Sequence, residues 1–289
     1  MSFTVFTDAC SNLPGAVLKN RLIHTLPCSY TMDGQQGIYN GDIDAFDAHT
    51  HYELLRAGHL FQTSLLNTQL FLDHFRPVLE AGEDVLYVGM SSGISGTYHA
   101  AVTAAEELAA EYPNRKIRTV DSMGAGFGPG LLTIRATELR DQGKTLDETA
   151  DILDRERLNL CEYFTVDDLM FLRRTGRVNA ATALVGTMLN IKPVLRGDEE
   201  GHIVVSAKCR GRRKAVDALV RIYEERVVHP ENQIVAISHG DCPEDAQLLA
   251  DRIRTIASPR ELLVYPHEPF TGSHVGPGML GLFFFGEGR

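Results

Sequence analysis

The chain has 289 residues, of which 44% are hydrophobic and 23% charged, so it can bury a full core and is long enough for two domains. Its formal net charge of -10 argues against a general nucleic-acid-binding protein, which needs a basic face. Because no stretch resembles a signal peptide or reaches the apolar length of a membrane span, we expect the protein to be cytoplasmic.

In the first part of the chain, short β-branched runs alternate with amphipathic segments. This alternation is typical of a parallel α/β layer, so we expect an N-terminal α/β domain over residues 1–160. We expect strands at 3–8, 23–30, 84–89 and 116–122, and helices at 14–21, 44–58, 67–82, 97–112, 128–143 and 146–160.

From residue 161 onward the pattern changes, and we expect a C-terminal α+β domain over residues 161–289. Residues 191–210 read as two strands joined by an acidic turn that contains a glycine, which indicates a hairpin. The other expected strands are 161–166, 233–240, 261–269 and 281–286, and the expected helices are 167–176, 180–190, 212–227 and 243–257.

Cysteine and histidine spacing favours neither a disulfide framework nor a metal site. The five cysteines are odd in number, scattered and without a C-x-x-C pair, which is typical of reduced core thiols. His49 and His51 stand two residues apart and would not share a helix face. We therefore expect no metal and no cofactor.

Residues 89–93 spell G-x-S-x-G, which raises the hypothesis that Ser91 is a nucleophile. A serine hydrolase would also need a histidine, and His239 follows an expected strand. Against this hypothesis, the helix after Ser91 is expected to start only near Ser95, Gly96 and Thr97, and no H-G-G-G element is present. A serine hydrolase acting on acyl esters is therefore the alternative hypothesis.

Hydroxyl-rich glycine turns at strand ends suggest anion binding instead. Helix N-termini offer unpaired N–H donors and a partial positive charge, so such turns bind carboxylate or phosphate. Thr63 and Ser64 stand before an expected helix, Ser122 follows a strand, and Ser273 and His274 stand near the end of the chain. In an α/β layer such turns gather at the carboxyl ends of the strands. Simple helix capping by Ser95 and Thr97, or a small-anion binder, remains open.

Seven stretches, taken together and in order, resemble the DegV family, the fatty-acid-binding subunits of bacterial fatty acid kinases. They are TDACSNLP, TSLLNTQLF, SSGISGTYHAA, VDS, LRRTGRVNAATALVGTMLNIKPVL, KCRGRRKA and GSHVGPG. The resemblance implies two α/β lobes that enclose one fatty acid in a tunnel between them. It implies that Thr63, Ser95 and His274 hold the carboxylate, with Ser64, Gly96 and Thr97 as neighbours in the same site.

The resemblance also implies that the protein is not catalytic alone. A separate kinase subunit, which carries the ATP and metal sites, would phosphorylate the bound carboxylate to an acyl phosphate for phospholipid synthesis. Arg174, Arg177 and Arg210 are implied to face that partner, although a solvated helix face is the ordinary interpretation of clustered basic residues.

Two departures from the family pattern bear on the ligand. Ala9, Cys10 and Asn12 replace the usual hydroxyl and acidic positions of the first motif, and Leu65-Leu66 replaces the frequent Gln-Pro after Thr63-Ser64. We expect the second change to affect acyl-chain preference.

Three assignments stay open at this point. The small-residue helix at 180–191 fits either core or the lining of an acyl tunnel. The segment 281–286 could form an edge strand or an apolar surface patch. Transient membrane contact is also open, because a lipid carrier must exchange its cargo with a bilayer.

Overall fold

The computed structural model describes residues 3–178 and 190–289, and the chain divides into two compact units. Unit 1 comprises Met1–Ala45 and Gln62–Arg157, and unit 2 comprises Phe46–Phe61 and Leu158–Arg289. A mixed α/β fold with two lobes is therefore confirmed. The domain boundary predicted from the sequence, between residues 160 and 161, places residues 46–61 in the N-terminal domain. The contacts that this segment makes instead group it with unit 2.

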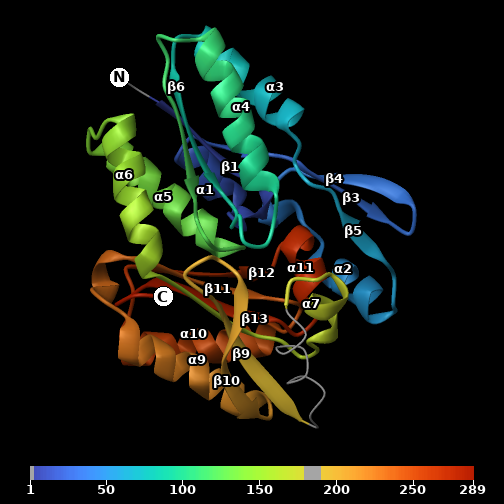
Figure 1. Cartoon of the computed structure of the whole chain (residues 1–289). Helices are drawn as coiled ribbons and strands as arrows, with labels where there is room; N and C mark the ends of the chain where they lie inside the picture. Colours follow the sequence, from blue (N-terminus) through green and yellow to red (C-terminus); the bar gives the residue numbers. More distant parts are fainter. Residues whose placement is uncertain (1–2, 179–189) are drawn as a thin grey trace. The chain divides into compact units, whose positions relative to one another are not determined.

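Unit 1 is built on a four-stranded parallel sheet in the order β2-β1-β6-β7 (Figure 1). In its register, Val5 of β1 pairs with Ile23 of β2 on one side and Leu86 of β6 on the other. Parallel alignment brings the carboxyl ends of β1, β6 and β7 to the same edge. The strands are β1 (Phe3–Asp8), β2 (Ile23–Leu26), β6 (Asp84–Gly89) and β7 (Ile117–Asp121).

Two pairs of helices cover this sheet, with α3 and α4 on one face and α5 and α6 on the other (Figure 1). Thr145 and Glu148 form a reciprocal capping box that starts α6. Gly130 lets α5 approach the turn after β1, since an added Cβ would lie 2.3 Å from the carbonyl oxygen of Ser11. The helices are α1 (Gly15–Asn20), α3 (Thr68–Glu80), α4 (Thr97–Glu111), α5 (Phe127–Asp141) and α6 (Leu146–Glu156).

The single strand expected at 23–30 is two strands, because Pro27 between them has no N–H to donate to a ladder. The second of them joins a small sheet in the order β4-β3-β5. Asp33 and Gly34 both have positive φ in the β3–β4 turn, as a two-residue hairpin requires, and our sequence analysis missed this signal. The strands are β3 (Cys28–Met32), β4 (Gln35–Tyr39) and β5 (Phe61–Thr63).

Unit 2 is built on a six-stranded mixed sheet in the order β10-β9-β8-β13-β11-β12. Only β11 and β12 pair in parallel, and the hairpin expected at 191–210 is confirmed by the antiparallel pairing of β9 with β10. The strands are β8 (Leu160–Thr165), β9 (Ile191–Gly197), β10 (Ile203–Arg210), β11 (Ile234–His239), β12 (Glu261–Pro266) and β13 (Leu280–Phe285).

The helices of unit 2 form two groups. α9 and α10 pack together on the sheet, where the rings of Tyr223 and Phe284 lie 5.1 Å apart (Figure 1). α11 packs against α2 and α7, and the buried Tyr52 of α2 donates its hydroxyl to the carbonyl of His267 at 2.9 Å. The helices are α2 (Ala48–Arg56), α7 (Met170–Arg174), α9 (Arg212–Arg226), α10 (Pro243–Ile256) and α11 (Pro269–Val275).

The segment 281–286 is neither an edge strand nor a surface patch, and both hypotheses are wrong. It forms β13 in the interior of the unit 2 sheet, with β8 on one side and β11 on the other. Its phenylalanines Phe283 and Phe284 are buried. A continuous apolar run is what a strand covered on both faces needs.

The helix expected at 180–191 lies almost wholly outside the described residues, so neither of its two interpretations is assessed. Within residues 3–178 and 190–289, no helix is both long enough and apolar enough to cross a membrane.

Candidate functional site

The turns that follow β6 and β7 in unit 1 are joined by hydrogen bonds. The N–H of Ser91 donates to the carbonyl of Gly124 at 2.8 Å, and the N–H of Ser122 donates to the carbonyl of Gly89 at 3.0 Å. The hydroxyl-rich turns of these two neighbouring strands therefore gather at one edge of the sheet, as the sequence predicts.

A buried carboxylate joins the turn after β1 to the same edge. Oδ2 of Asp8 accepts from the Tyr87 hydroxyl at 3.0 Å and from the N–H of Met90 at 3.1 Å, and Oδ1 accepts from the N–H of Cys10 at 3.0 Å. Burial raises the pKa of Asp8, while these hydrogen bonds act in the opposite direction. Asp8 thereby fixes Met90, where the turn that leads to α4 begins.

Ser91 serves this turn as a structural residue. Its side chain is fully buried, and its hydroxyl oxygen accepts from the N–H of Gly93 at 3.1 Å. His239, its hypothetical partner, belongs to unit 2, and its Nδ1 accepts from the N–H of Cys242 at 3.3 Å. The serine hydrolase hypothesis gains no support from this geometry.

The hydroxyls of Ser95 and Thr97 lie at the start of the 15-residue helix α4. The Ser95 oxygen accepts from the N–H of Thr97 at 3.2 Å, and the Ser95 hydroxyl donates to the Thr97 oxygen at 3.0 Å. The Thr97 side chain is 1% exposed, whereas Ser95 is only partly buried. The Ser95 hydroxyl, which can turn from Thr97 to another acceptor, is therefore the donor of this pair that an anion can reach. Gly96 is the N-cap and offers no side chain, so the positive end of the helix dipole adds to this donor set.

The segment that carries Thr63 and Ser64 lies beside this helix start. Methyl carbons of Leu65 lie 3.5 and 3.8 Å from the place where a Cβ on Gly96 would stand. Thr63 ends β5, and the N–H of Ser64 donates to the carbonyl of Ser29 at 3.0 Å. Asn67 caps α3, so Thr63 and Ser64 stand a few residues before this helix, which begins within one residue of the expected start at 67.

His274 belongs to unit 2 and lies in the last turn of α11, a helix that the sequence analysis did not predict. Burial, and after it the positive charge of Arg177, lower the pKa of His274 to about 4. The imidazole is therefore neutral at neutral pH, and it offers a hydrogen bond rather than a charge.

A buried polar network fixes the first turn of α11. The carboxylate of Glu268 accepts from the N–H of Thr271 at 2.8 Å and from the hydroxyl of the same residue. That hydroxyl lies 2.8 Å from Nε2 of His267, whose Nδ1 lies 2.8 Å from the hydroxyl of Ser238. Burial lowers the pKa of His267 to about 3, so its ring is neutral.

A second buried histidine, His51 of α2, contacts the middle of the same helix. Its Nε2 lies 3.2 Å from the hydroxyl of Ser273, which donates to the carbonyl of Pro269 at 2.6 Å. Burial lowers the pKa of His51 to about 4. The helix that carries His274 is thus held at both its first turn and its middle by buried hydrogen bonds.

The three arginines implied to face a partner have two different environments. Arg174 and Arg210 are exposed, and the Arg174 guanidinium lies 4.8 Å from the ring centre of Phe171. Arg177 is half-buried, donates to the carbonyl of Thr175, and has a pKa lowered by burial. Arg177 therefore exposes less of its side chain to a partner than Arg174 and Arg210 do.

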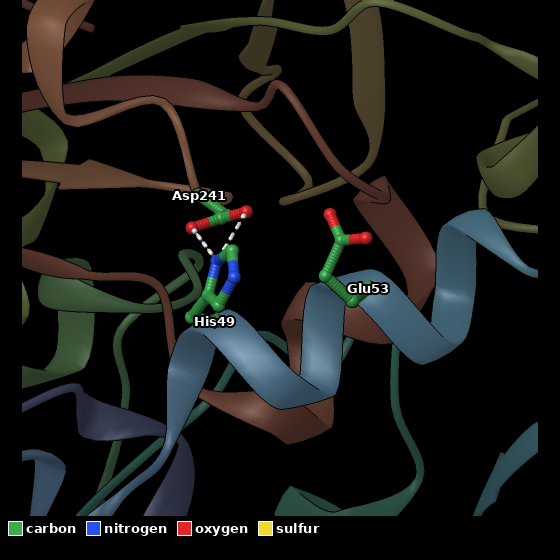
Figure 2. Close-up of side chains that lie close together, drawn as sticks. All are labelled: His49, Glu53 and Asp241. Carbon is green, nitrogen blue, oxygen red and sulfur yellow. Dashed lines mark hydrogen bonds and ion pairs between the residues drawn. The ribbon is translucent and has the colours of Figure 1, made fainter.

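One side-chain cluster in unit 2 has donors that a metal ion could use. Figure 2 shows His49 and Glu53 of α2 beside Asp241 of the turn after β11, and their ligand atoms lie within 4.8 Å of one another. However, Arg56 donates to Glu53 at 2.6 Å and also to Asp241. Although burial opposes it, Arg56 holds the pKa of Asp241 below its usual value. A guanidinium already supplies the positive charge here, so we assign the cluster to an ion-pair network that ties α2 to this turn.

Asp8 is a contributor to the site in unit 1 that was not predicted from the sequence. Its signal was a carboxylate directly at the end of a buried strand, a place where orphan N–H groups of neighbouring turns need an acceptor. Leu65 was expected from the sequence to bear on the ligand, but its place beside Gly96 was not.

Comparison with known proteins gives a match over almost the whole chain. A family model described as "Uncharacterised protein, DegV family" matches residues 2–287. A DegV domain-containing protein of Clostridium perfringens is 36% identical over 285 residues, which cover 99% of this chain and 98% of that protein. Another, of Streptomyces coelicolor, is 31% identical over 280 residues and 96% of each chain.

Solved structures share the fold and carry descriptions of their ligands. A DegV family protein from Thermus thermophilus, described as fatty acid binding, superposes with a TM-score of 0.86 at 28% identity and covers 99% of this chain and 100% of its own. DegV of Bacillus subtilis, described as a fatty acid binding protein, has a TM-score of 0.85 at 25% identity with the same coverage.

Proposed function

The chain belongs to the DegV family, and on that premise we propose that it binds one long-chain fatty acid and holds the carboxylate with neutral hydroxyl donors. The observation that carries this proposal is the hydroxyl pair of Ser95 and Thr97 at the start of α4, with the Thr63–Leu65 segment against it. Likeness to fatty-acid-binding structures over the full chain length supports the same class of ligand.

The energetics favour a site in which the acyl chain supplies the affinity. Burying a chain of about 16 carbons at about 0.8 kcal/mol per methylene gives on the order of 12 kcal/mol. That gain exceeds the several kcal/mol needed to remove a carboxylate from water. Hydroxyls and a helix N-terminus then suffice to orient the head group, and no lysine or arginine salt bridge is needed.

His274 is the residue of unit 2 that we propose as a further ligand contact, on the basis of the family resemblance. Its neutral imidazole suits this role, because it can donate a hydrogen bond without neutralising a carboxylate. A carboxylate that keeps its negative charge remains a nucleophile toward a phosphoryl group.

The direct test is mass spectrometry of the purified chain, first under native conditions and then after denaturation. We expect one fatty acid per chain, released on denaturation and restored when the delipidated protein is incubated with palmitate. A protein that is isolated empty and takes up no fatty acid would contradict the proposal.

Replacing Ser95 with alanine is expected to weaken palmitate binding about 10- to 100-fold. The variant lacks the hydroxyl that can turn from Thr97 to the carboxylate, and a hydrogen bond to a charged group contributes about 1.5–3 kcal/mol. Isothermal titration of the delipidated protein measures this change. Thr103→Ala is the control, since that hydroxyl lies on the exposed face of α4 and donates only to the carbonyl of His99. Equal affinities of the two variants would remove Ser95 from the site.

We further propose that the bound carboxylate is presented to a separate kinase subunit, which phosphorylates it, and that Arg174, Arg177 and Arg210 contribute to that encounter. The exposed guanidinium groups of Arg174 and Arg210 suit a partner surface because they can form forked hydrogen bonds to carboxylates and phosphates, and Arg177 is included on the family resemblance alone.

Replacing Arg174 or Arg210 with alanine is expected to lower kcat/KM with the kinase about tenfold, the effect of about 1.4 kcal/mol at an interface. The assay follows acyl phosphate formation with a fatty acid kinase catalytic subunit, ATP and palmitate. Arg254→Ala, an exposed arginine of α10, serves as the control. Palmitate affinity should stay unchanged in all three variants, and a loss of lipid binding in Arg174→Ala or Arg210→Ala would count against a role at the partner surface.

A further inference from the structure

Leu65 is an exposed aliphatic side chain of unit 1. It is 55% exposed, whereas the adjacent Leu66 is 2% exposed and belongs to the core. It follows Thr63 and Ser64, so an apolar side chain directly adjoins two hydroxyl residues that the family resemblance assigns to the ligand.

Leu65 lies beside the helix start. Its two terminal methyl carbons stand 3.5 and 3.8 Å from where a Cβ on Gly96 would be. Ser95 and Thr97, whose hydroxyls are 3.0 Å apart, flank Gly96 in the chain. A carboxylate that accepts from the Ser95 hydroxyl would bring its nearest methylenes close to Leu65.

We propose that Leu65 is a specificity-determining residue that packs against the first methylenes of the fatty acid, next to the carboxylate, and disfavours acids with a hydroxyl at C2. This inference rests on the proposed function. Unsubstituted methylenes gain from burial against the Leu65 methyl groups. A C2 hydroxyl packed against these methyl groups would lose water on that side without gaining a partner from Leu65, since a leucine side chain neither donates nor accepts.

The test compares palmitate with 2-hydroxypalmitate by isothermal titration of the delipidated full chain. The wild-type protein should bind palmitate about tenfold more tightly, because pocket discrimination of one small polar substituent is of that order. Leu65→Gln should reduce the preference to about threefold or less, because the amide can hydrogen-bond the added hydroxyl. Leu65→Ala should weaken palmitate itself.

Leu248→Gln is the matched control, since Leu248 is 47% exposed on α10, a helix that carries none of the residues assigned to the ligand. It should keep the wild-type preference. If the wild-type protein and Leu65→Gln bind palmitate well with the same preference, the role of Leu65 is overturned while fatty acid binding stands. If the wild-type protein binds neither acid, the proposed function fails and this inference fails with it.

Discussion

Replacing Asp8 with alanine is expected to destabilise the protein by about 3–5 kcal/mol, because three buried donors would each lose their acceptor. The donors are the N–H groups of Cys10 and Met90 and the hydroxyl of Tyr87. Urea denaturation measures the loss. Since Met90 begins the turn that leads to Ser95, palmitate affinity should fall as well.

Two further variants test whether the loss of stability comes from the hydrogen bonds that the Asp8 carboxylate accepts. Asp8→Asn keeps one acceptor oxygen and should lose about half as much stability. Asp73→Ala removes an exposed carboxylate of α3 that only accepts from Gln69, and it should change stability by less than about 0.5 kcal/mol. A loss in Asp8→Ala no larger than that of Asp73→Ala would show that Asp8 is not the anchor described above.

Acidification from pH 7 to pH 5 is expected to destabilise unit 2 through its buried histidines. The pKa values of His51 and His274 are about 4 and that of His267 is about 3, against 6.5 for an exposed histidine. Below pH 6.5 the unfolded chain binds protons that the folded chain does not bind, so stability falls until the pH reaches the folded pKa values. At pH 5 each ring contributes a loss of about 2 kcal/mol.

Differential scanning calorimetry at pH values between 7 and 5 measures this trend. His51→Gln should make stability depend less on pH, since the glutamine amide can hydrogen-bond Ser273 without taking up a proton. His229→Gln, at an exposed position, should leave it unchanged. Asp8 acts with the opposite sign, because a raised folded pKa favours the fold as the pH falls through that value. A midpoint temperature of unfolding that does not change with pH between 7 and 5 would contradict the assignment of neutral, buried histidine rings.

The sequence predicted those parts of the fold that depend on neighbouring residues. The alternation of strand and helix patterns predicted the parallel sheet of unit 1, and the turn at 198–202 predicted the β9–β10 hairpin. Each of these signals is formed by residues that are close together in the sequence. The strand predicted at 23–30 was too long, because Pro27 divides it into two strands and this effect of proline was not taken into account.

Contacts between distant residues could not be read from local patterns. α2 was predicted as part of the N-terminal domain, yet Tyr52 bonds to His267, 215 positions away. The G-x-S-x-G pattern says nothing about burial, and Ser91 proved to be a turn residue. The pairing of Leu65 with Gly96 needed coordinates, whereas the grouping of Thr63, Ser95 and His274 came from the family resemblance rather than from spacing.

The assignment of Phe46–Phe61 to unit 2 has a consequence for the order in which the chain can fold during synthesis. All of unit 1 leaves the ribosome by Arg157, but α2, which is made early, finds its partners only when Asp241 and His267 have emerged, 185 and 215 positions after Arg56 and Tyr52. Until then the apolar side of α2, with Ala48, Tyr52 and Leu55, has no core to join. The nascent chain therefore carries the α2 segment without its packing partners through most of its translation, and nine residues are too few to hold a helix by themselves.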